Sequence, residues 1–263
     1  MSAFDAQISR VAAYLREMQG DGRRVREFLC PAAVSALTQG LPIRIGPGAN
    51  PGIILRGDTF IELGNPAAGS CAFVLWTDEP SLVRDGRITL IGPSVQEVPG
   101  ASLPFGQILL VGGRDLSVEE HQAVGQAQYV ADQIEGYMVR SSSRNIWSRV
   151  SKDAAAKGFC FETLGRALMA IYKSSLPKVE AVEVLFVTSS KEDVLRLNGI
   201  ATEVRDLGTE IVKEHWKARG YDLTCDLDCR SCHDKDVCDD IRKVIAARIR
   251  RERDVVPDRP THP

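Results

Sequence analysis

The sequence predicts an α/β protein in which a mixed sheet is layered with helices, preceded by a helical segment and followed by a small cysteine-rich metal module. Three short apolar runs, at residues 71–77, 87–92 and 106–113, lie between loops that carry glycine or proline, which is typical of buried strands. After residue 106, apolar runs alternate with segments of helical period, and this alternation favours helices packed on a sheet. The 44% of hydrophobic residues can supply a core.

These patterns divide the 263 residues into four parts. Residues 1–40 are an N-terminal helical segment, residues 41–220 an α/β domain, residues 221–252 a four-cysteine module with a helix, and residues 253–263 a flexible tail. The tail is assigned from its charges and prolines, which leave little apolar surface to bury.

The first half of the chain is predicted from apolar spacing and from chain-breaking residues. Residues 3–20 carry apolar side chains at helical intervals, from Ile8 through Leu15 to Met18, and are expected to form a helix. Residues 41–66 contain five glycines and four prolines between short β-branched runs, which predicts turns and short strands.

A helix is also predicted from Ser117, because Glu120 follows three residues later as in a capping box. Its apolar stripe runs from Val124 through Ile134 to Met138. The next element, residues 146–151, is a short strand candidate.

The remaining elements follow by the same reasoning. Ser151 is a good cap for a short helix, and Pro177 ends a longer one. The sequence accordingly predicts a helix over residues 161–176, a strand over residues 181–189 and a long helix over residues 190–219.

Charge and hydropathy exclude some classes of protein. The formal charge of −2 and the pI near 6.1 indicate neither a nucleic-acid-binding nor a membrane-surface protein. The N-terminal residues carry charges every few positions and lack the apolar core of a signal peptide. The apolar runs are too short to span a bilayer. We therefore expect a cytoplasmic protein whose thiols are reduced. We expect neither a membrane nor a nucleic acid as its partner.

Four cysteines lie close together near the end of the sequence, in the spacing Cys-x3-Cys-x2-Cys-x5-Cys: Cys225, Cys229, Cys232 and Cys238. Sulfurs this close can converge on one metal centre, whereas disulfides fit poorly with a reducing compartment. A 4Fe–4S cluster is the favoured interpretation, since all four sulfurs stand in one run as in ferredoxins. Zinc is the alternative, although structural zinc usually takes two separated cysteine pairs.

The same run also bears on a radical-enzyme signature and on a nearby histidine. The first three cysteines also match the radical S-adenosylmethionine signature, but Ser231 stands where an aromatic residue is expected, and a fourth cysteine is present. His233 is expected to stay outside the set of ligands, because four cysteines already suffice.

Five segments of the chain occur in an order that resembles a known family. They are "GDTFIELGNPAAGSCAFVLW", "GRITLIGPSVQEV", "LPFGQILLVGG", "NIWSRVSKDAAAKGFCFETLGRALMAIYKSSLP" and "VEAVEVLFVTS". Together they resemble the α/β domain that precedes the nickel-cluster domain in the β subunit of the carbon monoxide dehydrogenase/acetyl-CoA synthase complex. The resemblance runs from about residue 58 to about residue 219, and residues 147–157 are its most specific part.

The resemblance implies a coenzyme A site. In that family the region is rich in arginines and includes a tryptophan associated with coenzyme A. Here Trp147 stands at the matching position, surrounded by Arg140, Arg144, Arg149 and Lys152. Arginine forks suit phosphate oxygens, and an indole can stack on a base, so the chemistry agrees. The alternative is an exposed basic loop whose tryptophan turns into the core.

One departure from the family limits what the resemblance implies. The sequence contains no Cys-Gly-Cys element of the nickel centre, and carries the four-cysteine run instead. The expected function is therefore that of an iron–sulfur accessory subunit in anaerobic one-carbon metabolism. It would dock with, or pass electrons to, a metalloprotein or corrinoid protein, without being a complete synthase. The alternative is a zinc-stabilised module that binds a coenzyme A-type or other anionic ligand.

A few isolated residues complete the candidates. Cys30, Cys71 and Cys160 are expected to be small buried hydrophobes. Glu62 stands among apolar residues, so a buried carboxylate there needs a partner, and it is a candidate site residue. A third hypothesis, an enzyme that combines the cluster with Glu62 or Cys71, rests on fold resemblance alone.

Overall fold

The computed structural model describes residues 3–46, 48–49, 53–115, 120, 133–142 and 145–218, and every structural statement below concerns these residues. Residues Met1–Val212 form one compact unit, and a second unit begins at Lys213. Arg144 and the four cysteines Cys225, Cys229, Cys232 and Cys238 lie outside the described residues.

The first sheet has five strands in the order β1-β4-β9-β6-β3. Their bounds are β1 Val25–Leu29, β3 Ser70–Thr77, β4 Arg87–Ile91, β6 Phe105–Gly113 and β9 Val179–Val187. The β3–β6 and β4–β9 pairs are parallel, whereas β6–β9 and β1–β4 are antiparallel. The prediction of a mixed sheet is therefore confirmed, with four of its strands close to the predicted positions.

A second sheet has four strands in the order β5-β2-β8-β7. Their bounds are β2 Thr59–Leu63, β5 Ser102–Leu103, β7 Tyr137–Ser142 and β8 Asn145–Ser151. The two sheets are joined by Ser70 of β3. Its hydroxyl donates to the carbonyl oxygen of Ile146 at 2.6 Å and accepts the amide hydrogen of the same residue at 2.7 Å.

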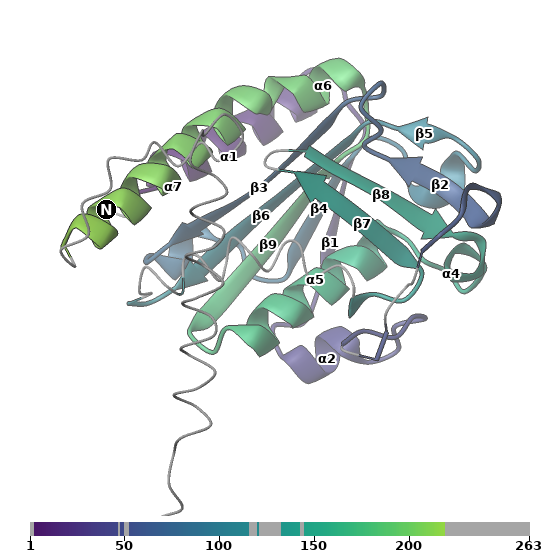
Figure 1. The fold of residues 1–263 in the computed structure, drawn as a ribbon, viewed down its shortest axis with the longest axis horizontal. Coiled ribbons are helices and arrows are strands. Elements are labelled where there is room, and N and C mark those ends of the chain that lie inside the picture. The colour runs from purple at the N-terminus through teal and green to yellow at the C-terminus, as the bar shows by residue number, and fades with distance from the viewer. Residues whose placement is uncertain are drawn as a thin grey trace, which may run out of the picture. The chain divides into compact units, whose positions relative to one another are not determined.

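Most of the helices lie beside the first sheet. The bounds of the helices are α1 Asp5–Gly20, α2 Val34–Thr38, α4 Lys152–Ala156, α5 Phe161–Ser175, α6 Lys191–Arg196 and α7 Asn198–Ala218, and short 3-10 turns cover Arg56–Asp58, Pro80–Leu82 and Val95–Glu97. Figure 1 shows α5 and α2 on one side of the first sheet and α1, α6 and α7 on the other, whereas α4 contacts β2 and β8 of the second sheet. Within the described residues, no helix is both long and apolar enough to cross a bilayer.

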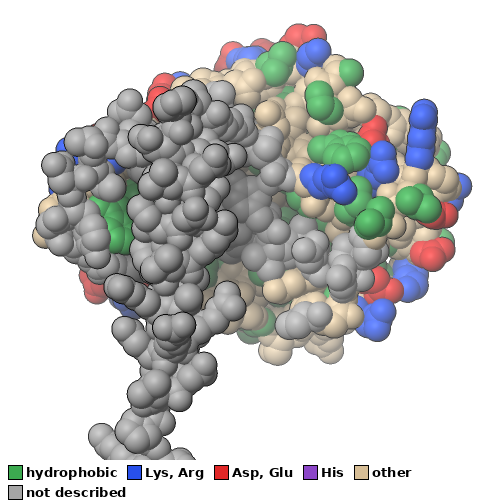
Figure 2. Space-filling model, viewed as in Figure 1, with side chains coloured by type: hydrophobic (Ala, Val, Ile, Leu, Met, Phe, Trp, Pro, Cys, Tyr) green, Lys and Arg blue, Asp and Glu red, His purple; other side chains and the backbone are tan. Residues whose placement is uncertain are grey.

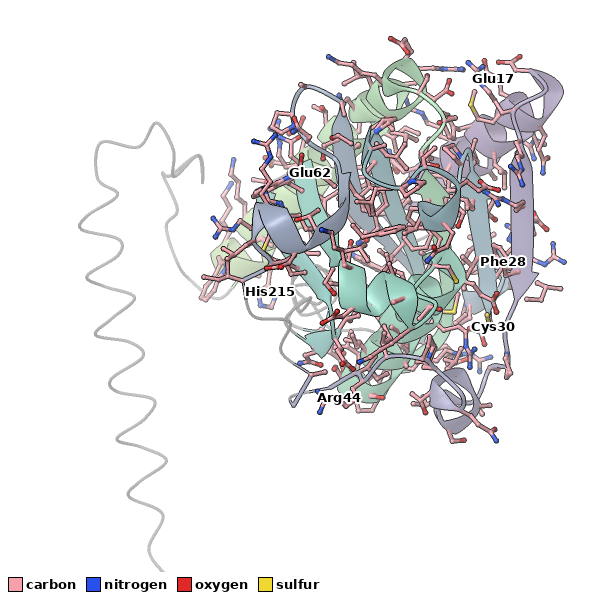
Figure 3. The ribbon with its side chains drawn as sticks, turned by 90° about the vertical axis from the view of Figure 1, so that its right-hand side faces the viewer. Glu17, Phe28, Cys30, Arg44, Glu62 and His215 are labelled. Atoms are coloured by element: carbon pink, nitrogen blue, oxygen red, sulfur yellow. The ribbon has the colours of Figure 1, made fainter. Side chains whose placement is uncertain are left out.

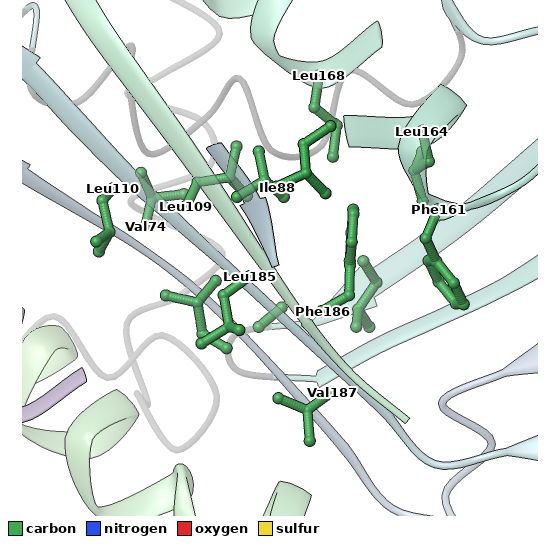
Figure 4. Packing of buried hydrophobic residues seen from close by; sticks show 14 of the residues in the cluster. Val74, Ile88, Leu109, Leu110, Phe161, Leu164, Leu168, Leu185, Phe186 and Val187 are labelled. Atoms are coloured by element: carbon green, nitrogen blue, oxygen red, sulfur yellow. The ribbon is translucent and has the colours of Figure 1, made fainter. Parts of the chain in front are cut away.

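The core is densest where α5 meets the first sheet. Phe186 of β9 lies with its ring centroid 6.0 Å from that of Phe105 and 5.1 Å from that of Phe161 (Figure 4). Gly165 lets the helix approach closely, because a Cβ atom there would lie 2.6 Å from Cδ1 of Ile88. The small residue therefore sets the distance between α5 and β4.

The predicted helix through residues 117–138 is wrong at its C-terminal end. Residues 117–119 and 121–132 lie outside the described residues, but Ile134 forms a bridge to Ile45, and Met138 belongs to β7. Gly136 explains the change, since its φ of 67° is costly for other residues. A Cβ atom at position 136 would also overlap the Cβ atom of Ala154.

Glu135 holds this turn in place. Its carboxylate accepts hydrogen bonds from Nζ of Lys157 at 2.7 Å and from the backbone N–H of Arg44 at 2.9 Å. The bond from Lys157, followed by that from Arg44, lowers the pKa of Glu135 to about 2. The carboxylate thus stays ionised at neutral pH and joins three segments of the chain.

The helices at residues 3–20 and 161–176 are confirmed, and the single helix predicted over residues 190–219 is two helices. The hydroxyl of Ser190 caps α6 by accepting the backbone N–H of Asp193 at 3.1 Å. The buried Asp193 carboxylate pairs with Arg23 at 3.0 Å. The cap stabilises the first turn of α6, and the ion pair connects this turn to Arg23, which follows α1.

Candidate functional site

The outer face of β8 carries the predicted site. Along this strand Ile146, Ser148 and Val150 are buried, while Trp147 and Arg149 point the other way and are half-buried. This follows from the two-residue period of a strand. Trp147 therefore lies outside the hydrophobic core, contrary to the alternative in which it turns inward.

Neighbouring elements bring two further cations to this region. Arg140 of β7 is the cross-strand partner of Trp147, so the two residues share a face of the sheet. Lys152 begins α4, where its Nζ donates to the carbonyl oxygen of Gly57 at 2.7 Å. The structure thus groups Arg140, Trp147 and Arg149, while Lys152 stands beyond the end of the strand.

Glu62 has the partner that a half-buried carboxylate needs. One of its oxygens accepts from Nε and Nη2 of Arg149 at 3.3 and 3.2 Å, and the other accepts from Nδ2 of Asn65 at 2.9 Å. Burial opposes the charged form, but the hydrogen bonds from Asn65 and Arg149 outweigh it and lower the pKa of Glu62. The carboxylate is therefore ionised at neutral pH and accepts three hydrogen bonds from its neighbours.

The same arginine fixes the tryptophan ring. The guanidinium carbon of Arg149 lies 4.7 Å from the indole centroid, a cation–π contact, and Nη1 donates to the carbonyl oxygen of Ile54 at 3.1 Å. The indole N–H of Trp147 is buried and helps to stabilise the charged form of the Glu62 carboxylate. The two groups do not meet the geometry of a hydrogen bond. Glu62, Arg149 and Trp147 thus form one ordered group.

A first cavity of about 580 Å³ lies on the Glu62 side of Trp147. Its charged lining residues are Glu62, Arg56 and Arg149. The remaining wall comes from β2, from Asn65 and from the chain around Ser102. This cavity combines the Glu62–Arg149 ion pair with a further cation, Arg56, and with polar and apolar walls.

A second cavity of about 440 Å³ also borders Trp147. It is enclosed by the turn between β2 and β3, the β7–β8 hairpin and the start of α6 and α7. Its charged lining residues are Arg140 and Lys191, and no described residue in its wall is acidic. Figure 2 shows basic side chains next to hydrophobic ones on the face of the molecule that carries β8.

The three cysteines outside the four-cysteine run differ in burial. Cys71 is fully buried, as predicted, whereas Cys30 and Cys160 are only half-buried. Cys30 lies well away from Glu62 in Figure 3 and is not among the residues that line either cavity. Among the described residues, no group of three or more histidine, cysteine or acidic side chains is placed to hold a metal.

Sequence reasoning missed several residues that line the cavities. Lys191, Asn145 and Asn198 border the second cavity, and Asn65 borders the first. Asn65 and Asn145 lie near predicted site residues in the sequence, but Lys191 follows Trp147 by more than forty positions. Only the folded arrangement of α6 against the turn after β2 brings Lys191 to this site.

Comparison with known proteins gives a consistent result. A profile of the CO dehydrogenase/acetyl-CoA synthase complex beta subunit family matches residues 41–194. The acetyl-CoA decarbonylase/synthase complex subunit beta 1 of Methanosarcina thermophila is 27% identical over 198 residues, which cover 74% of this chain and 38% of that protein. The corresponding subunit beta of Archaeoglobus fulgidus is 28% identical over 203 residues, covering 75% and 38%.

A bacterial relative is similar over a shorter stretch. The carbon monoxide dehydrogenase/acetyl-CoA synthase subunit alpha of Moorella thermoacetica is 33% identical over 151 residues, which cover 56% of this chain and 21% of that protein. The chain therefore spans less than two fifths of the length of these relatives. All the residues that form the two cavities, apart from Leu195 and Asn198, lie within the stretch that the family profile matches.

Proposed function

The chain belongs to the CO dehydrogenase/acetyl-CoA synthase complex beta subunit family, and from this membership we propose that it is an accessory subunit of anaerobic one-carbon metabolism. In this role it binds a coenzyme A-type ligand beside Trp147 and carries an iron–sulfur cluster. It docks with, or passes electrons to, a metalloprotein or corrinoid-protein partner. The relatives are named as subunits of complexes, which supports a protein partner.

The observation that carries the proposal is the ordered indole between two cavities. Coenzyme A combines phosphates, a purine and an extended apolar arm. A half-buried ring with cations on both sides offers stacking and ion pairing in one place. Each of the two cavities is by itself within the usual size range for a ligand site. With no Cys-Gly-Cys element in the sequence, the acetyl-forming step is not assigned to this chain.

Coenzyme A binding is expected to quench tryptophan fluorescence and to depend on Trp147. Trp147→Ala removes the stacking surface, so we expect the dissociation constant, measured by calorimetry, to rise at least about tenfold. Trp216→Ala on α7 is the matched control and should leave affinity within about twofold. Equal affinities for the two variants would place the ligand elsewhere.

The metal proposal rests on the four cysteines. A 4Fe–4S cluster supplies one-electron chemistry when bound, and Cys225, Cys229, Cys232 and Cys238 are its proposed ligands. Zinc would instead make the chain a binding module, because zinc has no redox chemistry. The two metals therefore correspond to the two functional hypotheses.

Protein purified without oxygen should contain about four irons and four acid-labile sulfides per chain, with a brown colour. Iron, zinc and sulfide analysis of the full chain, together with a visible spectrum, makes this measurement. About one zinc without sulfide would support the binding-module alternative instead. Protein with neither metal would remove the electron-transfer role.

A further inference from the structure

The two cavities beside Trp147 differ in charge, and this difference assigns the parts of a ligand. Resting on the proposed binding of a coenzyme A-type ligand, we infer that its phosphates bind in the second cavity, between Arg140 and Lys191. Lys191 of α6 is then an anion-binding residue. Arg149 is a positioning residue that holds the Trp147 ring.

The first cavity is less suited to phosphate than the second, because its two cations, Arg56 and Arg149, share it with the Glu62 carboxylate. Of these cations, Arg149 already shares two hydrogen bonds with the Glu62 carboxylate and a third with the carbonyl oxygen of Ile54. A phosphate placed there would lie close to an ionised carboxylate, and like charges repel strongly where solvent is limited. This cavity better suits an uncharged part of the ligand that hydrogen-bonds to Asn65 or Ser102.

The second cavity has the opposite balance. Within the described residues, neither Arg140 nor Lys191 has a carboxylate partner, and no acidic side chain lines the wall. The ammonium group of Lys191 donates to one neutral acceptor, the carbonyl oxygen of Ala67, at 3.1 Å. An ammonium group has three hydrogens to donate, so it can also bind phosphate oxygens.

The local backbone places Lys191 at the cavity wall. The turn after β2 is closed by Asn65, whose side-chain oxygen accepts the N–H of Ala67 at 2.9 Å and whose carbonyl accepts the N–H of Gly69 at 3.0 Å. Gly69 has a φ of 99°, and a Cβ atom there would lie 2.9 Å from Cγ of Lys191. The absence of a side chain at Gly69 therefore leaves room for the lysine stem.

The indole connects the two regions. Arg149 covers part of the Trp147 ring and lines the first cavity but not the second. The second cavity therefore borders a part of the ring that the guanidinium does not cover. A ligand with phosphates between Arg140 and Lys191 can place an adjoining ring or arm against that exposed part.

The test measures coenzyme A affinity by calorimetry on the full chain. Lys191→Ala should weaken binding about tenfold, the usual effect of losing a charge-assisted hydrogen bond. Lys191→Arg should restore most of it. Lys178→Ala is the matched control, because its Nζ also donates to a backbone carbonyl, that of Asp115 at 2.9 Å, and it lines neither cavity. It should change affinity less than about twofold.

Three outcomes separate this inference from the proposed function. Tenfold weakening in Lys191→Ala alone supports both. Coenzyme A binding that is unchanged in Lys191→Ala overturns the inference and leaves the proposed function standing. If the unaltered chain does not bind coenzyme A, the proposed function fails, and inorganic pyrophosphate is titrated instead. If the unaltered chain binds pyrophosphate and Lys191→Ala does not, the second cavity remains an anion site. If the unaltered chain does not bind pyrophosphate either, the inference is overturned.

Discussion

Replacing Gly64 with alanine is expected to destabilise the protein by more than about 3 kcal/mol, a loss in the range of severe core defects. Gly64 ends the β2 segment with a φ of 71°, and its N–H donates to the carbonyl oxygen of Leu103 at 2.9 Å. A Cβ atom there would overlap the carbonyl oxygen of Ile146. Since backbone cannot move aside as a flexible side chain can, the clash adds to the cost of a positive φ.

Gly100→Ala separates these two causes. Gly100 has a φ of 75°, but a Cβ atom there would meet no atom within 4 Å. We expect this control to cost only about 1–2 kcal/mol, the penalty of the left-handed backbone. Urea unfolding of both variants makes the comparison. Equal losses of stability would mean that β2 and β8 can separate to admit the methyl group.

Replacing Cys229 with serine is expected to remove most of the bound metal. A hydroxyl is a much poorer ligand than a thiolate for iron–sulfur clusters and for zinc, so the metal content per chain should fall below about half of its original value. Colour and iron content measure this for a cluster, and zinc analysis measures it for the alternative. An unchanged metal content would exclude Cys229 as a ligand.

The same variant tests whether the α/β body needs the metal. Residues Met1–Val212 are a compact unit with a core of their own. The unfolding midpoint of this unit should therefore stay nearly constant in Cys229→Ser. Cys160→Ser is the matched control, because Cys160 stands at the N-cap position of α5, outside the cysteine run, and serine is a favourable residue at that position. Loss of the whole fold in Cys229→Ser alone would show that the metal stabilises the body as well.

The strands and helices that sequence reasoning predicted best are those with uniform surroundings. β3 and β6 are buried along their whole lengths, and their continuous apolar runs reveal them directly. α5 is equally clear, since it ends just before Pro177 and buries one side against β9. In these elements local pattern and tertiary packing favour the same structure.

The sequence pattern does not reveal two of the strands, each for its own physical reason. β7 was absorbed into a predicted helix because Ile134 and Met138 stand four positions apart, a spacing that also suits a helix face. Gly136 between them was the available signal for a turn. β1 was missed because it has polar residues between its apolar ones and only half-buried side chains.

The candidate site was predictable only where it is local in sequence. Trp147 and Arg149 stand on one strand, so their shared face follows from alternation. The ion pair with Glu62 depends on the register between β2 and β8, in which Glu62 is the partner of Arg149. The position of Lys191 from α6 in the site depends on tertiary packing, which the periodicity of the sequence does not encode.

The bridge between Ser70 and Ile146 has a consequence for how the molecule opens. The amide hydrogen of Ile146 is held by a hydroxyl on the other sheet, so it can exchange with solvent only when the two sheets part. Amides held within a single sheet report the fraying of one strand pair instead. Deuterium uptake at Ile146 therefore measures the free energy of parting the layers, and any ligand that stiffens β8 should slow that uptake.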